Sequence, residues 1–104
     1  MKKVIENIAH SVISRIYEIS CGEYLEDEQE TIYIQETDLI HEKEQIGYFK
    51  ASVEVNDKFE FKLIDCIVDI IMTNCNKAIN ITNAVNNYIL KYEGKYIENI
   101  LYWK

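Results

Sequence analysis

The sequence contains no proline and only three glycines among its 104 residues. It therefore offers no glycine-rich phosphate loop, and neither a G-x-S-x-G nor an H-E-x-x-H motif is present. Its three cysteines, Cys21, Cys66 and Cys75, are odd in number and form no C-x-x-C pair. They predict neither a disulfide framework nor a cysteine-based metal or redox site. We expect free thiols and no cofactor.

Long apolar runs are also missing. No uninterrupted run approaches the roughly 20 residues that a membrane-spanning helix needs. The charges of Lys2, Lys3 and Glu6 interrupt what would be the apolar core of a signal peptide. These absences predict a cytoplasmic protein with no membrane partner.

Candidate catalytic groups are few and isolated. His10 and His41 are the only histidines, and the sequence places no converging ligands around them. Asp65 and Asp69 would lie one turn apart on a helix, but no third ligand accompanies them. Cys21 should follow a helix C-terminus, where the helix dipole disfavours a thiolate. We expect no catalytic, cofactor-binding or metal-binding residues, and hence a protein that is not an enzyme.

What the sequence does contain is a large apolar fraction and an excess of negative charge. Apolar residues make up 48% of the chain, which indicates a packed core, and the length fits a single domain over residues 1–104. Asp and Glu number 18 against 11 Lys and Arg, which gives a formal net charge of −7. Because such a chain repels phosphates, we expect no direct nucleic-acid binding and a partner that is basic or neutral.

The N-terminal part reads as a helix followed by an acidic loop and a strand. Residues 2–20 carry apolar side chains at spacings of three and four, which predicts an amphipathic helix that Gly22 ends as a left-handed cap. Residues 31–35 alternate as a strand does, and 39–41 either extend it or form a short separate piece before a turn at 43–45.

Two further runs of alternating apolar and polar residues, 48–55 and 58–63, predict a β-hairpin with one wet face. Only a loop with an odd number of residues puts both apolar sets on one face, so we expect a three-residue connection over 56–58. This register pairs Val55 with Phe59, Val53 with Phe61, Ala51 with Leu63 and, unfavourably, Glu54 with Glu60. The wet face would hold Tyr48, Lys50, Ser52, Glu54, Glu60 and Lys62.

The C-terminal part is more ambiguous. Polar residues over 62–80 recur at spacings of three and four, which favours a nearly buried helix, while the many Ile and Val residues make a strand continuing to about Met72 the alternative. A second apolar stripe over 85–103 stays in phase across Gly94, so we favour one bent helix over two helices. Together these elements predict an α+β domain. It has a small three-stranded antiparallel meander, an N-terminal helix and one or two C-terminal helices packed on one face.

The acidic stretch from Glu23 to Glu44 is the one functional signal. It is either solvated surface or a negative surface that docks into a basic groove as phosphates would. On the second interpretation the protein is a small inhibitor of a protein target, such as a nuclease or another nucleic-acid-binding enzyme, of the phage anti-defence or toxin-immunity type. The Ile, Asn, Lys and Tyr usage is typical of an AT-rich bacterial or phage genome.

The alternative is a structural homo-oligomer, such as a homodimer, or an adaptor that buries its aromatic C-terminal helix. An open sheet edge or the wet face could meet a partner in either case. The candidate partner-binding residues are Glu23, Glu26, Asp27, Glu28, Glu30, Glu36, Asp38, Tyr96, Tyr102 and Trp103.

Overall fold

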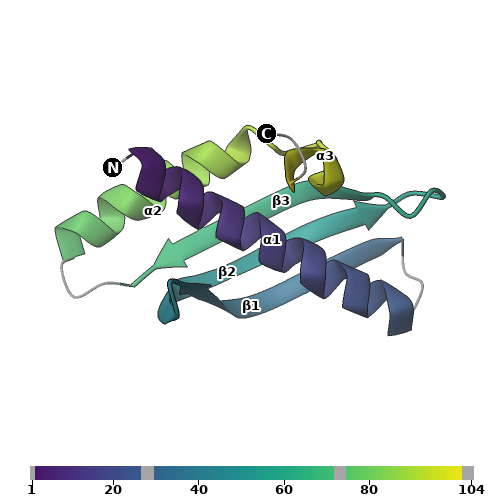
Figure 1. Ribbon diagram of the computed structural model, residues 1–104, viewed down its shortest axis with the longest axis horizontal. Helices are drawn as coiled ribbons and strands as arrows, with labels where there is room; N and C mark the ends of the chain where they lie inside the picture. The colour runs from purple at the N-terminus through teal and green to yellow at the C-terminus, as the bar shows by residue number, and fades with distance from the viewer. Residues whose placement is uncertain (1, 27–29, 72–74, 102–104) are drawn as a thin grey trace.

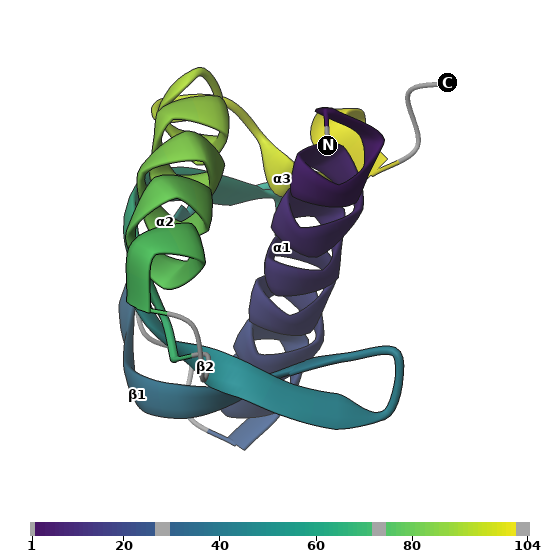
Figure 2. The ribbon, with the colours of Figure 1, turned by 90° about the vertical axis from the view of Figure 1, so that its left-hand side faces the viewer.

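The computed structural model describes residues 2–26, 30–71 and 75–101 of the chain. Its elements follow in the order α1 (Lys2–Glu26), β1 (Thr31–His41), β2 (Glu44–Val55), β3 (Phe61–Ile70), α2 (Cys75–Leu90) and α3 (Ile97–Leu101). The strands form one antiparallel sheet in the order β1-β2-β3. All three helices lie on the same side of this sheet (Figures 1 and 2). The predicted α+β meander with helices on one face is confirmed.

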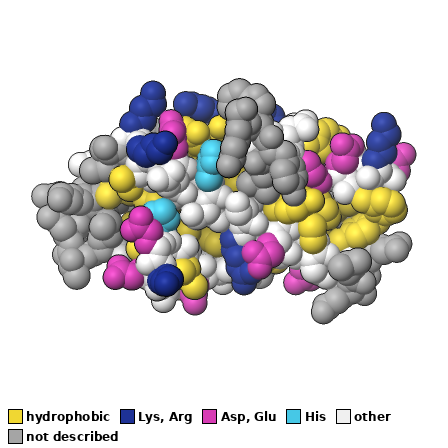
Figure 3. All heavy atoms as spheres, in the orientation of Figure 1, with side chains coloured by type: hydrophobic (Ala, Val, Ile, Leu, Met, Phe, Trp, Pro, Cys, Tyr) yellow, Lys and Arg dark blue, Asp and Glu magenta, His cyan; other side chains and the backbone are white. Residues whose placement is uncertain are grey.

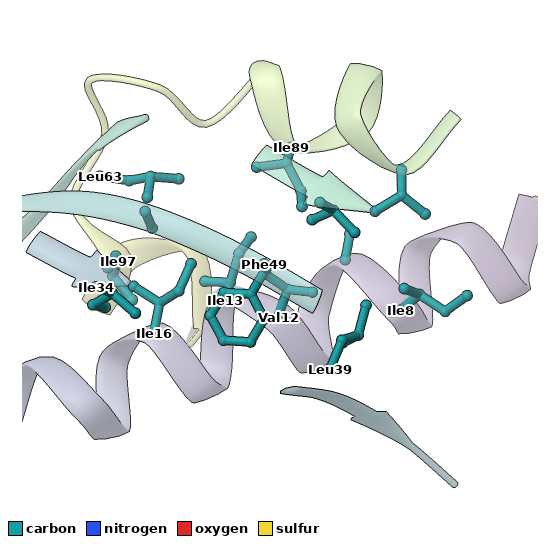
Figure 4. Close-up of a cluster of buried hydrophobic side chains, with 14 of the residues drawn as sticks. Ile8, Val12, Ile13, Ile16, Ile34, Leu39, Phe49, Leu63, Ile89 and Ile97 are labelled. Atoms are coloured by element: carbon teal, nitrogen blue, oxygen red, sulfur yellow. The ribbon is translucent and has the colours of Figure 1, made fainter. Parts of the chain in front are cut away.

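The core lies between the helices and the face of the sheet that they cover. Figure 4 shows side chains from every helix and strand meeting in one cluster, with Phe49 of β2 next to Val12 and Ile13 of α1. Leu63 of β3 and Ile89 of α2 join the cluster, and all five side chains are almost completely buried. Because full burial of such a side chain contributes roughly 1.5–3 kcal/mol, this cluster holds the helices on the sheet.

Helix α1 continues past its expected stop. Gly22 was predicted to end the helix, but its φ is not positive and the helix runs on to Glu26. Tyr24 explains the additional turn, because its ring packs edge-on against Phe59 and Phe61, with centroids 5.6 and 6.2 Å away. A long-range aromatic contact therefore overrides the local stop signal.

Strand β1 joins the two pieces that the sequence left separate. Residues 31–35 and 39–41 form one strand, with a bulge between Ile34 and Thr37. The turn to β2 consists of Glu42 and Lys43, whose φ angles are 52° and 68°. The predicted turn at 43–45 was therefore wrong by one residue. Two-residue hairpin turns of this kind usually contain Gly, Asn or Asp, so the sequence carried no signal for it.

The hairpin between β2 and β3 has the predicted faces but a different register. The loop covers 56–60, and Val55 pairs with Phe61 and Val53 with Leu63. The predicted three-residue loop was wrong, although the requirement for an odd number of residues holds. Asn56 sets the longer loop, because its Oδ1 accepts hydrogen bonds from the backbone N–H groups of Lys58 and Glu60, each 2.9 Å long.

The correct register also removes the unfavourable acidic pair. Glu54 lies opposite Lys62 instead of Glu60. A bulge at Ile64 then shifts the ladder, so that Ser52 pairs with Asp65.

The helix that the sequence favoured over 62–80 is wrong up to Ile70, where the strand alternative is correct, while residues 75–80 are helical and belong to α2. Val68 and Ile70 are buried on the inner face, while Ile67 and Asp69 are exposed on the other. Residues with branched β-carbons pack well on such a half-buried sheet.

The C-terminal segment contains two helices, so the favoured single bent helix is also wrong. Gly94 lies in the connection between α2 and α3. Its φ of 80° is a left-handed conformation, which interrupts the helix at this point. Its N–H donates to the carbonyl oxygen of Leu63 (2.7 Å), and the N–H of Leu63 donates to the carbonyl oxygen of Lys95 (3.0 Å). The connection is thus pinned to the outer edge of β3.

Candidate partner-binding surface

The described residues of the predicted site do not form one cluster. Glu23 is exposed on α1 and Glu30 just before β1, whereas Glu36 and Asp38 are exposed on β1 itself. Glu26 is the last residue of α1. Asp27, Glu28, Tyr102 and Trp103 lie outside the described residues. The expected acidic loop is therefore divided between the end of a helix and an edge strand.

Tyr96 is engaged inside the protomer. Its hydroxyl accepts a hydrogen bond from Asn56 Nδ2 (3.3 Å), and Lys62 Nζ lies 5.7 Å from its ring centroid. Its backbone also forms an isolated bridge with Lys62. The half-buried ring thus anchors the C-terminal segment to β3.

The side of the sheet opposite the helices, called here the outer face, is left uncovered by the described elements. Directly paired residues share a face, so the ladder assigns its members. They are Thr31, Tyr33, Asp38, Tyr48, Lys50, Ser52, Glu54, Lys62, Asp65, Ile67 and Asp69. Of the predicted wet face, five residues are confirmed, and the sixth, Glu60, lies in the loop.

The outer face combines two exposed apolar side chains with acidic neighbours: Tyr33 lies on edge strand β1 and Ile67 on edge strand β3, with Lys50 and Ser52 of β2 between them. Tyr33 and Ile67 expose 69% and 57% of their surface, and large apolar side chains elsewhere, such as Ile71 and Ile79, are exposed to a similar degree. A shallow hollow of about 250 Å³ lies between them and is bordered by Lys50 and Asp65. A wider hollow of about 630 Å³ extends from Lys50 toward α2. Four carboxylates face two lysines on this surface, so its charge is negative.

The C-terminal half closes most of the outer edge of β3. Asn86 of α2 imitates a neighbouring strand, because its Oδ1 accepts from the N–H of Val68 (2.9 Å) and its Nδ2 donates to the carbonyl oxygen of Val68 (2.8 Å). Thr82 Oγ1 accepts from the N–H of Ile70 (3.1 Å). The carboxylate of Glu98 accepts from the N–H of Phe61 through both oxygens, at 3.1 and 3.0 Å. An edge satisfied in this way is closed to further strands.

The opposite edge, β1, is bordered by a groove against α1. The groove has a volume of about 590 Å³ and is lined by Asn7, His10, Ser11, Ser14, Arg15, Glu18, Asp38, Leu39, Ile40, His41 and Phe49. Figure 3 views the molecule from the α1 side, and both histidines, in cyan, lie on this surface. The groove is therefore polar at its walls, while the buried Leu39 and Phe49 form an apolar floor.

The polar groups of the groove favour hydrogen bonding over nucleophilic chemistry. Ser11 Oγ lies 3.4 Å from His41 Nδ1, and His41 Nε2 lies 4.0 Å from Glu42 Oε1. However, the Ser11 hydroxyl donates to the carbonyl oxygen of Asn7 (3.0 Å), and the Glu42 side chain is 85% exposed. A serine nucleophile needs a base held by a buried partner, and this arrangement does not supply one.

The described part of the chain also brings together no group of three His, Cys, Asp or Glu side chains that could hold a metal ion. Cys66 on β3 is the described thiol with a displaced pKa. Burial, as the largest cause, and the nearby carboxylates of Asp65 and Glu93 together raise the pKa of this thiol to about 12. A thiol that stays protonated is a poor nucleophile and metal ligand, so Cys66 serves packing.

Sequence reasoning anticipated the outer face but missed the groove. The alternation in β2 and β3 identified the wet face directly. The groove instead requires α1 to dock beside β1, which joins Ser11 to His41 across 30 residues, and no local pattern reports such a contact.

Among residues 2–26, 30–71 and 75–101, no helix is both long enough and apolar enough to cross a bilayer. No protein-family model, curated protein or solved structure matches this chain. Its function has to be argued from the geometry of these surfaces.

Proposed function

We propose that this protein acts by binding another protein through its outer face, without catalysing a reaction. The observation that carries the proposal is the exposed pair Tyr33 and Ile67, which border one hollow on a sheet face that the described elements leave uncovered. An aromatic and an aliphatic anchor surrounded by polar groups is the usual composition of an interface centre and its rim. Its cytoplasmic location is part of the same proposal.

The partner that fits this face has a basic surface. The carboxylates of Asp65 and Asp69 flank Ile67 on β3, and Glu54 lies nearby on β2. Together with the net charge of −7, they would attract a cationic partner and accelerate its association. A groove that normally binds nucleic acid is such a surface, so we propose inhibition of a nucleic-acid-handling enzyme, of the phage anti-defence or toxin-immunity type.

The homo-oligomer that buries an aromatic C-terminal helix is not favoured by a specific observation. Tyr96 is held by Asn56, and the hydroxyl of Tyr92 donates to that of Tyr88 (3.3 Å), so these rings already have partners within the chain.

Three variants test the proposal against a bacterial lysate and then against the purified captured protein. Tyr33→Ser with Ile67→Ser removes the two large apolar side chains that the outer face exposes. Asp65→Asn with Asp69→Asn removes two charges from the outer face. Asp57→Asn with Glu93→Gln is the matched control, because these residues are also exposed, are not among the candidate partner-binding residues, and change the net charge equally, from −7 to −5.

We expect the first variant to lose the captured protein and the second to associate more slowly with a weaker dependence on salt. The control should behave as the original protein. The captured protein should bind nucleic acid, and the original protein should inhibit it. Capture that survives loss of Tyr33 and Ile67, or equal effects of both charge variants, would contradict a role for the outer face.

A fourth variant, with Glu26, Asp27, Glu28 and Glu30 neutralised, tests the acidic stretch that the sequence singled out. Capture lost only with this variant would move the binding site from the outer face to the segment between α1 and β1.

A further inference from the structure

The outer edge of β1 presents backbone groups that no other described element pairs with. The N–H of Val55 donates to the carbonyl oxygen of Glu30 (2.8 Å), so Ile32 exchanges hydrogen bonds with Val53. Backbone groups of successive residues point to opposite sides of a strand. The N–H and C=O of Tyr33 therefore point away from the sheet.

The same reasoning applies beyond the bulge. The N–H of Ile71 donates to the carbonyl oxygen of Ile46 (2.8 Å), so the backbone of Ile46 points toward β3. The backbone N–H and C=O groups of Gly47 and Phe49 on β2 therefore point toward β1. Their partners in the ladder are Leu39 and Thr37, so the backbone of Asp38, between them, also points outward. Tyr33 and Asp38 thus mark a strand edge that is ready to receive another strand.

A strand added here would find room on both of its sides. Alternate side chains would project toward α1, into the groove lined by Ser11, Ser14 and His41 with the apolar floor of Leu39 and Phe49. The remaining side chains would lie along the outer face. Extended peptides bind in this way to sheet edges, where main-chain hydrogen bonds supply affinity and pockets for alternate side chains supply specificity.

The charge of β1 selects the occupant. The strand carries Glu36 and Asp38 but no Lys or Arg, and the adjoining turn has Glu42 and Glu44 on either side of Lys43. A second copy of this chain would place like charges against each other, which is unfavourable. A segment containing lysine or arginine would be attracted instead.

We propose that β1 binds an extended, basic segment of the partner protein by strand addition, with alternate side chains of that segment entering the groove between α1 and β1. This inference rests on the proposed function as a protein-binding domain and specifies how part of the partner is held. The strand of the partner pairs with Tyr33 and Asp38 and lies antiparallel or parallel to β1.

The test uses a blocked peptide of about nine residues in which lysine alternates with valine or threonine, long enough to cover one strand. Two further peptides carry N-methyl groups on alternate residues, in one phase or the other. Only one phase faces β1, so we expect one methylated peptide to bind as the parent does and the other to lose binding. Binding would be followed by titration, with hydrogen exchange at the amides of Tyr33 and Asp38.

Two protein variants provide an independent comparison. Asp38→Pro removes the outward N–H without removing a backbone hydrogen bond between β1 and β2, whereas Asp38→Ala keeps that donor. Both variants lose the side-chain bond that Asp38 Oδ1 accepts from Gln45 Nε2 of β2 (3.0 Å), so the comparison between them isolates the N–H. We expect the proline variant to bind the peptide about tenfold more weakly than the alanine variant, which corresponds to the loss of one hydrogen bond. Circular dichroism would verify that both variants are folded.

Equal binding of the two methylated peptides, equal affinity of the two variants, or no binding of the parent peptide would each overturn strand addition. Without peptide, the amides of Tyr33 and Asp38 could become more protected from hydrogen exchange as the protein concentration rises. This result would show that a second copy occupies the edge, and it would also overturn the proposal. The proposed function has a separate readout. The peptide could fail to bind although capture of the partner still depends on Tyr33 and Ile67. This result would overturn strand addition at β1 and leave the outer face as the interface.

Discussion

Replacing Asn86 with alanine should reveal how much this one side chain contributes to closing the edge of β3. The amide makes three hydrogen bonds, two with the backbone of Val68 and one from Nδ2 to the carbonyl oxygen of Thr82 (3.0 Å). Each typically contributes about 1 kcal/mol net, and alanine regains about 0.6 kcal/mol as the better helix former. We therefore expect Asn86→Ala to lower the free energy of unfolding by about 2 kcal/mol.

Chemical denaturation with urea measures this loss, and thermal unfolding should show a midpoint lowered by roughly 10 °C for a domain of this size. Hydrogen exchange at the Val68 amide supplies the local readout, because its only acceptor in the described structure is Asn86 Oδ1. That amide should exchange faster in the variant than amides between β1 and β2.

Two further substitutions separate the hydrogen bonds from other effects. Asn86→Asp can still accept from the N–H of Val68 but cannot donate to its carbonyl oxygen, so it should be at least as destabilising as alanine. Asn87→Ala is the matched control, because Asn87 is the exposed neighbour on the same helix, and it should raise stability by at most about 0.6 kcal/mol, the gain in helix propensity alone. Equal stability of the alanine variants at 86 and 87 would refute the role assigned to Asn86.

Three other perturbations have definite signs. Gly22→Ala should raise the free energy of unfolding by roughly 0.5–1 kcal/mol, because no atom lies within 4 Å of the added Cβ and glycine is costly inside a helix. Gly94→Ala should lower it by about 1–2 kcal/mol, because the φ of Gly94 is positive. Urea denaturation measures both changes. A lower stability of Gly22→Ala would contradict the placement of Gly22 inside a regular helix. For Cys66, the folded thiol has a pKa of about 12 against the ordinary value of 9.0, so above pH 9 the unfolded chain loses its proton first and stability falls. The slope from this group is at most about 1.4 kcal/mol per pH unit, and the Cys66→Ala variant should show a correspondingly flatter decline between pH 9 and 11; parallel curves would contradict the raised pKa.

The sequence predicted faces more reliably than registers. Alternation in β2 and β3 identified which residues point inward, but a three-residue and a five-residue loop satisfy the same alternation. The choice between them depends on Asn56, whose Oδ1 holds two backbone N–H groups of the longer loop, and on the pairing of Glu54 with Lys62. Neither interaction has a periodic signature.

The incorrect prediction of a helix over the part of 62–80 that forms β3 has a simple geometric origin. Asp65 and Asp69 are four residues apart, which places them on one face of a helix and also, because four is even, on one face of a strand. Ile67 between them should be polar if the segment is a strand with a solvated face. Its apolar side chain on the outer face made the strand look like a helix, and the same residue is now part of the proposed interface.

The stop predicted at Gly22 and the continuity predicted across Gly94 failed for a related reason. Whether glycine ends a helix depends on contacts from distant residues. Tyr24 reaches the β2–β3 loop and extends α1, whereas the backbone of Gly94 bonds to Leu63 and leaves the helical conformation. Local propensity was similar in both places, and tertiary contacts decided each outcome.

A three-stranded sheet has two faces and two edges, and the described part of this chain closes one of each. The helices cover the inner face, and α2, the Gly94 connection and α3 close the edge at β3. The outer face and the edge of β1 that remain are continuous, since Tyr33 and Asp38 contribute side chains to the face and backbone groups to the edge. Carboxylates on this combined surface therefore act twice: they attract a basic segment and they discourage β1 from pairing with a second copy. Neutralising Glu36 and Asp38 should consequently weaken binding of a basic peptide and increase self-association at the same edge, two effects that a merely solvated acidic surface would not connect.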